Sequence, residues 1–342
     1  DAATMREACD GAIAQADGDI DDALRLLNET RQAISFLIAL ATLDAVQPAA
    51  DSARQLAELA DAVLGSVVEI AEDELRAAHG SVPGARFAVL GYGSLGGCEL
   101  GFGSDLDLVF LYDAAPDAES DGRRPIEAQR WFARLAQKIV GYLQTPTASG
   151  RLFEVDVRLR PDGSKAMLVS TLANFVDYQR ERAWTWERQA LVRARCVVGD
   201  AGLCEAFEQA RADILATPRD AAALREDVVS MRRKMRAELD RSDARVFDLK
   251  QGEGGLVDLE FLLQYLVLRD AASRAALARP RASDALIRVL AEAGALNDDE
   301  AAQLLAAHRQ LLEAGLRCTL DRRPRRMPPT VGIKAAAHAI NT

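Results

Sequence analysis

The glycine-rich segment 91–113 constrains the fold of this chain more than any other feature. It reads GYGSLGGCELGFGSDLDLVFLYD, and a short apolar run at 87–90 precedes it. Short apolar runs separated by glycines predict two strands, 87–90 and 106–112, joined by a turn. Because side chains alternate along a strand, Asp105 and Asp107 are expected to point to one side while the leucines between and after them enter a core.

Two neighbouring carboxylates on an otherwise apolar strand repel each other and lose hydration. A bridging cation removes both costs, and hard oxygen ligands suit Mg²⁺ that also holds phosphates, for which the glycine turn offers backbone N–H groups. A third predicted strand, 152–159, carries Asp156, Arg158 and Arg160 on one face. Its alternative interpretation is a surface ladder of ion pairs. After an Asp-x-Asp strand, however, the pattern favours metal binding with triphosphate contacts.

Composition excludes several classes of function. The net charge of −10 disfavours a nucleic-acid partner, which requires a basic face. No apolar run approaches the ~20 residues of a membrane helix, and no secretory pattern is present, so we expect a cytoplasmic protein without membrane contact. Five cysteines, an odd number without CxxC spacing, argue against a disulfide framework or a zinc site. The first residue is Asp1 and not Met, which favours a fragment of a longer protein.

Hydrophobic periodicity predicts an α+β fold, with a small sheet flanked by helices. We expect a helical lead-in over 1–80, a nucleotidyltransferase domain over 81–200 and a helical bundle domain over 201–320. A short fourth strand is expected at 166–170. The basic, proline-rich tail 321–342 is interpreted as a solvated linker.

The spacing of the acidic residues resembles a known signature. Gly93-Ser94, ten further residues and then Asp105-Leu-Asp107-Leu are similar to the signature of the polymerase-β-like nucleotidyltransferase superfamily. Asp156 falls where that superfamily places its third carboxylate. The resemblance implies a polymerase-β-like sheet.

Four ordered motifs make the resemblance more specific, because together they look like the glutamine synthetase adenylyltransferase family across roughly residues 20–320. That family carries one copy that removes AMP by phosphorolysis and one that adds AMP from ATP to a tyrosine of glutamine synthetase. This chain resembles the carboxy-terminal, adenylylating copy. The motifs are 91–113, 154–161 (EVDVRLRP), 183–195 (AWTWERQALVRAR) and 250–265 (KQGEGGLVDLEFLLQY).

The resemblance implies a Mg²⁺-dependent nucleotidyltransferase. Asp105, Asp107 and Asp156 would hold two Mg²⁺, and Asp156 would also help to deprotonate the tyrosine that attacks the α-phosphorus of ATP. Pyrophosphate would then leave in line. The residues expected to bind the nucleotide are Gly93, Ser94, Ser104, Arg158, Arg160 and Lys250.

Two positions depart from the family, since Ser94 stands where many members have lysine and Arg188 where histidine is common. The implied partners are glutamine synthetase, a PII-type signalling protein and glutamine as an effector, in the regulation of nitrogen metabolism. Two alternatives remain: phosphorolytic removal of AMP at the same metal site, and a non-catalytic regulatory module. All three carboxylates are present, which counts against the latter.

Overall fold

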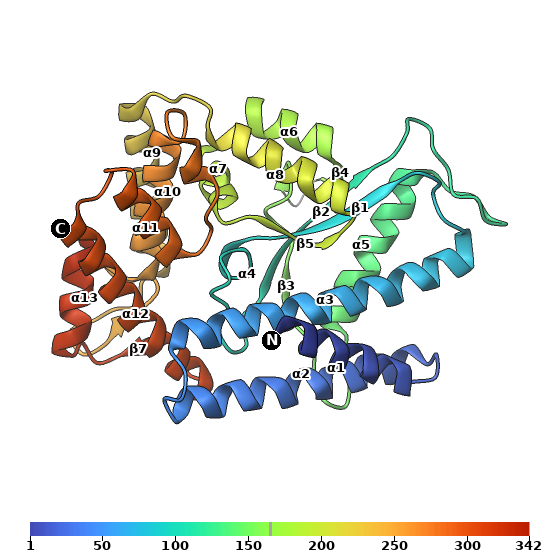
Figure 1. Cartoon of the computed structure of the whole chain (residues 1–342), viewed down its shortest axis with the longest axis horizontal. Helices are drawn as coiled ribbons and strands as arrows, with labels where there is room; N and C mark the ends of the chain where they lie inside the picture. The colour runs from blue at the N-terminus through green and yellow to red at the C-terminus, as the bar shows by residue number, and fades with distance from the viewer. Residues whose placement is uncertain (164–165, 342) are drawn as a thin grey trace. The chain divides into compact units, whose positions relative to one another are not determined.

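The computed structural model describes residues 1–163 and 166–341 (Figure 1). The chain forms two compact units, each described here by itself. The first unit contains residues 1–40, 54–182 and 194–210, and the second contains residues 41–53, 183–193 and the chain from Arg211 onward. No helix in the described ranges is both long and apolar enough to cross a bilayer.

The fold is α+β, as expected. Up to residue 200 the elements are α1 (Ala2–Gln15), α2 (Ile20–Leu43), α3 (Ala49–His79), β1 (Arg86–Gly91), α4 (Gly93–Gly96), β2 (Leu106–Asp113), α5 (Ala128–Gln144), β3 (Val155–Asp156), β4 (Val169–Thr171), α6 (Leu172–Glu181), α7 (Thr185–Val192) and β5 (Arg195–Gly199). The remaining elements are α8 (Ala201–Leu215), α9 (Ala221–Leu239), β6 (Phe247–Asp248), α10 (Leu256–Asp270), a 3₁₀ turn at Ala275–Ala278, α11 (Ser283–Glu292), α12 (Asp298–Leu320), β7 (Arg326–Met327) and α13 (Val331–Asn341).

The sheet of the first unit is built around β2. β1 pairs with one edge of β2 in antiparallel fashion, and β5 pairs with the far edge of β1. The other edge of β2 takes two short parallel strands, β3 near its start and β4 near its end. Because β2 is central, its stretch 108–111 is buried on both faces, and this explains the unbroken apolar run in the sequence.

Aromatic side chains attach α5 to this sheet. The ring of Phe132 on α5 stacks on Phe87 of β1 at 5.7 Å and on Tyr112 of β2 at 4.9 Å between centroids. Such rings bury large apolar areas and add a contribution from stacking geometry. The packing holds the β1–β2 pair rigid behind the glycine-rich turn.

The second unit is helical apart from the β6–β7 pair, and its core contains a buried arginine. Arg211 is 1% exposed, and its guanidinium donates to the carbonyl oxygens of Leu191 (2.9 Å), Ala278 (2.5 Å) and Val192. Leu191 and Val192 end α7, and Ala278 ends the 3₁₀ turn. One cation therefore satisfies carbonyls at two helix ends that would otherwise be buried without partners.

Two expectations about secondary structure are wrong. The third strand covers only Val155–Asp156 and not 152–159, because β4 pairs with the remaining edge of β2. The tail is no solvated linker, since residues 331–341 form α13, whose buried Ile333 and Ile340 belong to the core.

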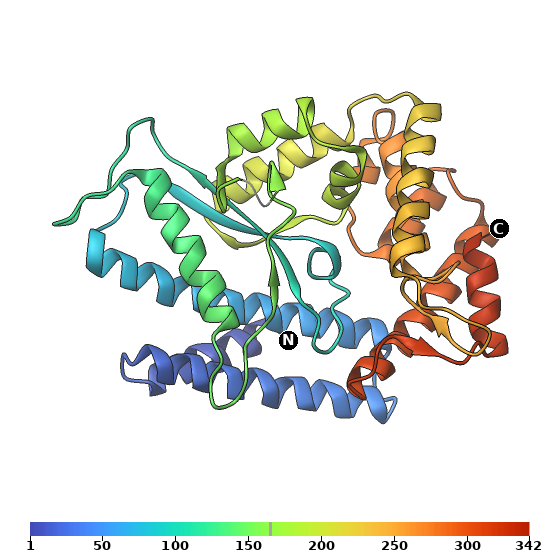
Figure 2. The ribbon, with the colours of Figure 1, turned by 180° about the vertical axis from the view of Figure 1, so that it is seen from behind.

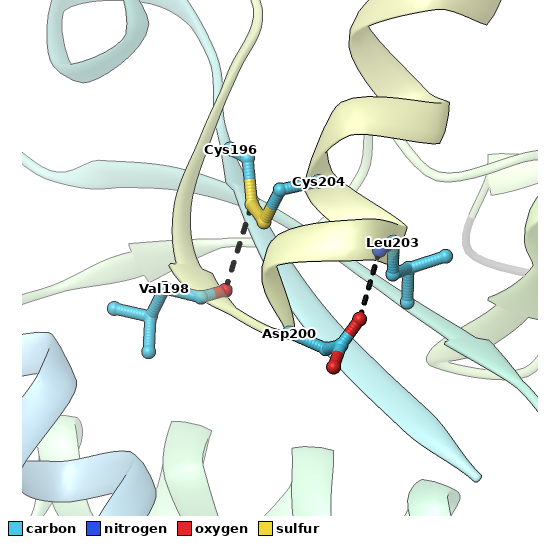
Figure 3. Close-up of a disulfide and its surroundings, with 5 residues drawn as sticks. All are labelled: Cys196, Val198, Asp200, Leu203 and Cys204. Atoms are coloured by element: carbon cyan, nitrogen blue, oxygen red, sulfur yellow. Dashed lines mark hydrogen bonds between the residues drawn. A yellow bond between two sulfur atoms is a disulfide. The ribbon is translucent and has the colours of Figure 1, made fainter.

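One disulfide corrects the expectation from the cysteine count. Figure 3 shows Cys196 of β5 joined to Cys204 of α8. The Cα atoms of the two cysteines are 5.5 Å apart. The backbone N–H of Leu203 donates to the Asp200 carboxylate at 2.9 Å at the start of α8. The disulfide and this bond tie the first turn of α8 to the edge strand of the sheet. Cys9, Cys98 and Cys318 are free.

Replacement of Arg211 by Met should lower the free energy of unfolding by at least about 3 kcal/mol. Three buried carbonyls lose their donor, and each unsatisfied buried group costs about 1–3 kcal/mol. Denaturant titration followed by circular dichroism measures the loss. As a control, Arg309→Met removes an exposed arginine of α12 and should change stability by less than about 0.5 kcal/mol. Equal effects of the two substitutions would contradict the role assigned to Arg211.

Candidate active site

The pairing of β2 with β3 brings two of the predicted carboxylates together. The parallel register sets Leu106 beside Val155 and Asp107 beside Asp156. Neighbouring residues in a ladder share a face of the sheet, so the two carboxylates lie on the same side. Asp105 directly precedes β2 and is exposed, whereas Asp107 and Asp156 are half-buried. Residues about fifty positions apart in sequence thus form one acidic cluster.

The glycine-rich turn packs directly on this cluster. The backbone N–H of Tyr92 donates to the carbonyl of Asp107 at 2.9 Å. Gly93 follows with a φ of +54°, and a Cβ placed on it would lie 2.5 Å from Oδ2 of Asp107. Both the conformation and the close approach require glycine here. The turn therefore presents its backbone beside a carboxylate, the arrangement expected where phosphates and a metal meet.

Arg158 already supplies a cation to the cluster. Its Nε donates to both carboxylate oxygens of Asp156, at 3.0 and 2.8 Å, and its backbone N–H donates to Oδ1 at 2.8 Å. The charges of Asp107 and Asp105 also act on this guanidinium. The hydrogen bonds from Arg158 hold the pKa of Asp156 below its usual range, so this carboxylate stays ionised. Within the described ranges, no three carboxylate, thiol or imidazole side chains are grouped so that they would hold a metal ion as they stand.

The other predicted nucleotide-binding residues differ in their surroundings. Ser94 is half-buried in α4, and Oγ of Ser104 accepts from the backbone N–H of Gly101 at 3.2 Å, just before Asp105. Lys250 is exposed and belongs to the second unit.

The alternation pattern predicted that Arg160 shares a strand face with Asp156, and this prediction is wrong. The strand has ended by then, and Arg160 is 8% exposed. Its guanidinium donates to the carbonyls of Val157 (2.5 Å) and Ala166 (3.3 Å). Because its donors are engaged by backbone carbonyls, Arg160 shapes the loop between β3 and β4.

An ion pair behind the glycine turn was missed by sequence reasoning. Arg195 of β5 donates to the Asp61 carboxylate of α3 at 2.8 Å and to the carbonyl of Leu95 in α4 at 3.2 Å. The Arg195 side chain is 17% exposed and that of Asp61 is 27% exposed. The pair therefore fixes the turn that carries Gly93. No local signal marks Asp61, because it lies 134 positions from its partner.

The sequence of this chain matches two family models and several known proteins. The model of glutamate-ammonia ligase adenylyltransferase matches residues 1–210, and that of GlnD PII-uridylyltransferase matches residues 229–339. The bifunctional glutamine synthetase adenylyltransferase/adenylyl-removing enzyme of Stenotrophomonas maltophilia (strain K279a) is 59% identical over 342 residues, covering 99% of this chain and 36% of that protein.

Two further relatives carry the same name. That of Xanthomonas campestris pv. campestris (strain B100) is 59% identical over 99% of this chain and 36% of its own length. That of Xanthomonas axonopodis pv. citri (strain 306) is 60% identical over 93% of this chain and 34% of its own length. The chain therefore spans about a third of the length of these curated relatives.

Gly93→Ala should weaken Mn²⁺ binding at least tenfold, because the new methyl group displaces the Asp107 carboxylate. Isothermal titration calorimetry measures the affinity. Gly103→Ala is a matched control, since Gly103 also has a positive φ (+67°) but open space around its Cα. That control should cost about 1–2 kcal/mol of stability from the left-handed conformation and leave Mn²⁺ affinity unchanged. Equal metal affinities in the two variants would show that the Gly93 contact is unimportant.

Arg158→Gln should raise the affinity for Mn²⁺, because the guanidinium no longer competes for Asp156. The Arg158 side chain is 81% exposed, and exposed ion pairs are worth about 0–1 kcal/mol, so the gain should not exceed about fivefold. Electron paramagnetic resonance of free Mn²⁺ reports the affinity. Arg151→Gln breaks the nearby Arg151–Glu154 pair and should change nothing. Weaker binding in the Arg158 variant would remove Asp156 from the metal site.

Proposed function

Because this chain belongs to the glutamate-ammonia ligase adenylyltransferase family, we propose that it transfers AMP from ATP to a tyrosine of glutamine synthetase. The relatives named for this activity are 59–60% identical to it. The observation that carries the proposal is the acidic cluster: Asp107 lies beside Asp156, and Gly93 packs against the first of them. Nucleotidyl transfer needs clustered carboxylates next to a backbone that accommodates phosphates.

The donor set fits Mg²⁺, and we propose two ions held by Asp105, Asp107 and Asp156. All three ligands are carboxylates, which hard divalent cations prefer. The paired guanidinium of Arg158 supports this, since it shows that Asp156 lies where a cation is stabilised. When bound, Mg²⁺ would neutralise the triphosphate and stabilise the attacking and leaving oxygens of an in-line displacement.

The chain's own residues bind and orient the substrate. Gly93 packs against the Asp107 carboxylate, and the backbone N–H groups of Gly93 and Ser94 are the proposed donors to phosphate oxygens. Arg158 is exposed and mobile enough to leave Asp156 for a phosphate, because its ion pair is only a weak surface interaction. Its planar guanidinium suits phosphate better than an ammonium group does. We assign Ser104 to the support of Asp105, and Arg160 to the loop after β3.

The state of Asp156 bears on the route of the proton. Hydrogen bonds from Arg158 lower the pKa of Asp156, and a bound cation that replaced them would favour the ionised carboxylate in the same way, so Asp156 is a weak proton acceptor in either state. We therefore assign to Asp156 the holding of a cation, and not the removal of the proton from tyrosine. The phenolic proton would pass to solvent as the tyrosine oxygen bonds to the α-phosphorus and pyrophosphate leaves.

Regulation follows from the second family match. The segment 229–339 is similar to a PII-uridylyltransferase, which supports a PII-type signalling protein as a regulatory partner. Glutamine as an effector and Lys250 as an anion contact are proposed on the family resemblance alone. Since ATP is the donor, we place the reaction in the cytoplasm.

The rival activity is phosphorolytic removal of AMP, because the relatives are named for both reactions. Both reactions proceed by in-line displacement at the same phosphorus, so the acidic cluster does not distinguish them. The motifs 183–195 and 250–265 favour the adenylylating direction. A non-catalytic regulatory module is disfavoured by the intact carboxylate cluster.

We expect the chain to transfer label from α-labelled ATP to unmodified glutamine synthetase. With AMP-modified glutamine synthetase and phosphate, it should release no ADP. Asp107→Asn serves as the negative control and should lower transfer at least a hundredfold. ADP release in the second assay without transfer in the first would reverse the proposed direction. If the chain is inactive in both assays and the Asp107→Asn variant behaves the same as the unaltered chain, the regulatory module is favoured.

A further inference from the structure

A groove runs between α9 and α10 of the second unit. The two helices lie side by side (Figure 2). Its volume is about 330 Å³, and it belongs to none of the site described above. On α9 the lining residues are spaced by three and four, from Arg225 to Arg236, so they form one stripe over three helical turns. The groove is thus extended along the helices.

The floor of the groove is apolar and only partly covered. Val228 and Val229 contribute from α9, and Val229 is 38% exposed. From α10 come Phe261, Leu262 and Tyr265, all of intermediate exposure. Apolar side chains along a helix pair that remain open to solvent are typical of a surface that receives another element.

The rim of the groove is strongly basic. Arg232 and Arg236 both form ion pairs with the Asp258 carboxylate, at 2.5 and 2.6 Å. Arg225 and Arg233 are exposed. The described parts of the chain offer neither of them an ion pair or a side-chain hydrogen bond. Glu253 also pairs with Arg236, at 3.5 Å. Four arginines against these two carboxylates still leave an excess of positive charge in a chain whose net charge is −10.

The spacing of these two arginines selects the shape of the ligand. Arg225 and Arg233 are eight residues apart, which is about 12 Å along a helix. A phosphate group or a nucleotide bound by both would leave the apolar floor between them uncovered, because Val228 and Val229 lie between the two arginines. An amphipathic helix with carboxylates two turns apart and apolar side chains between them matches both features.

We propose that this groove docks an acidic amphipathic helix of a partner protein. Carboxylates at positions i and i+7 of that helix pair with Arg225 and Arg233, and its apolar side chains at i+3 and i+4 enter the floor beside Val229 and Phe261. The proposal concerns the second unit only and is independent of the nucleotidyl transfer proposed above.

The test uses the full chain and a fluorescein-labelled designed helix with leucine at i+3 and i+4 and glutamate at the other positions, including i and i+7. Fluorescence anisotropy should show saturable binding that weakens as salt rises. A second peptide with every glutamate replaced by lysine should bind at least tenfold more weakly. A third, with the leucines replaced by serine, should lose binding as well. Equal binding of the acidic and basic peptides would overturn the proposal.

Variants locate the binding. The double variant Arg225→Glu/Arg233→Glu should lower the affinity for the acidic peptide at least tenfold. Val229→Asp should lower this affinity as much, although it leaves the arginines of the rim in place. Lys234→Glu is the matched control, because Lys234 is exposed on α9 but does not line the groove, and it should stay within about twofold. Circular dichroism confirms that each variant is folded. An unchanged affinity in the double variant would also overturn the proposal.

A nucleic-acid surface is the competing interpretation of a basic stripe. A labelled single-stranded RNA of mixed sequence is therefore offered to the same proteins. Tighter binding of the RNA than of the acidic peptide, lost in the double variant, would replace the helix by a nucleic acid and contradict the proposal.

Discussion

The register between β2 and β3 is the constraint on which the candidate active site depends. β2 is held from its other edge by the antiparallel pairing with β1, so its outward-facing residues have no freedom to change sides. The parallel pairing then sets Asp156 beside Asp107. A slip of one residue would turn one carboxylate to the opposite face and dissolve the cluster. Only two residues of β3 are paired, so the neighbouring β4 and α5 contribute to holding this register.

Two ion pairs near the cluster differ in their energetic role. Arg158 and Asp156 form a pair whose cation is almost fully exposed, and such pairs contribute about 0–1 kcal/mol. Arg195 and Asp61 are mostly buried, and breaking a buried pair is far more costly because it strands a charge. The first pair is therefore easily exchanged for a metal ion or a phosphate. The second maintains the position of the glycine turn.

In the second unit, helix ends are buried, and their backbone groups need hydrogen-bond partners inside the protein. Arg211 places one guanidinium among three carbonyls from two segments, and α13 supplies apolar side chains to the same unit. Asp258 has a comparable role at the start of α10, where it accepts from the backbone N–H of Gly254 at 2.6 Å and neutralises two arginines of α9. These contacts fix the spacing of α9 and α10, and with it the groove between them.

Local patterns in the sequence determined the strands β1 and β2 and most of the helices, because alternation and periodicity depend only on near neighbours. Tertiary structure decided where the third strand ends, that Arg160 is buried, that Cys196 meets Cys204 and that the tail packs as α13. Some of these partners are near in sequence, as Cys204 is to Cys196, but they meet only because a strand ends and the chain turns between them. Others are distant, since β4 competes for the edge of β2 and Asp61 lies more than a hundred residues from Arg195. Such pairings are set by which surfaces are left uncovered once the chain has folded, and no local pattern encodes that.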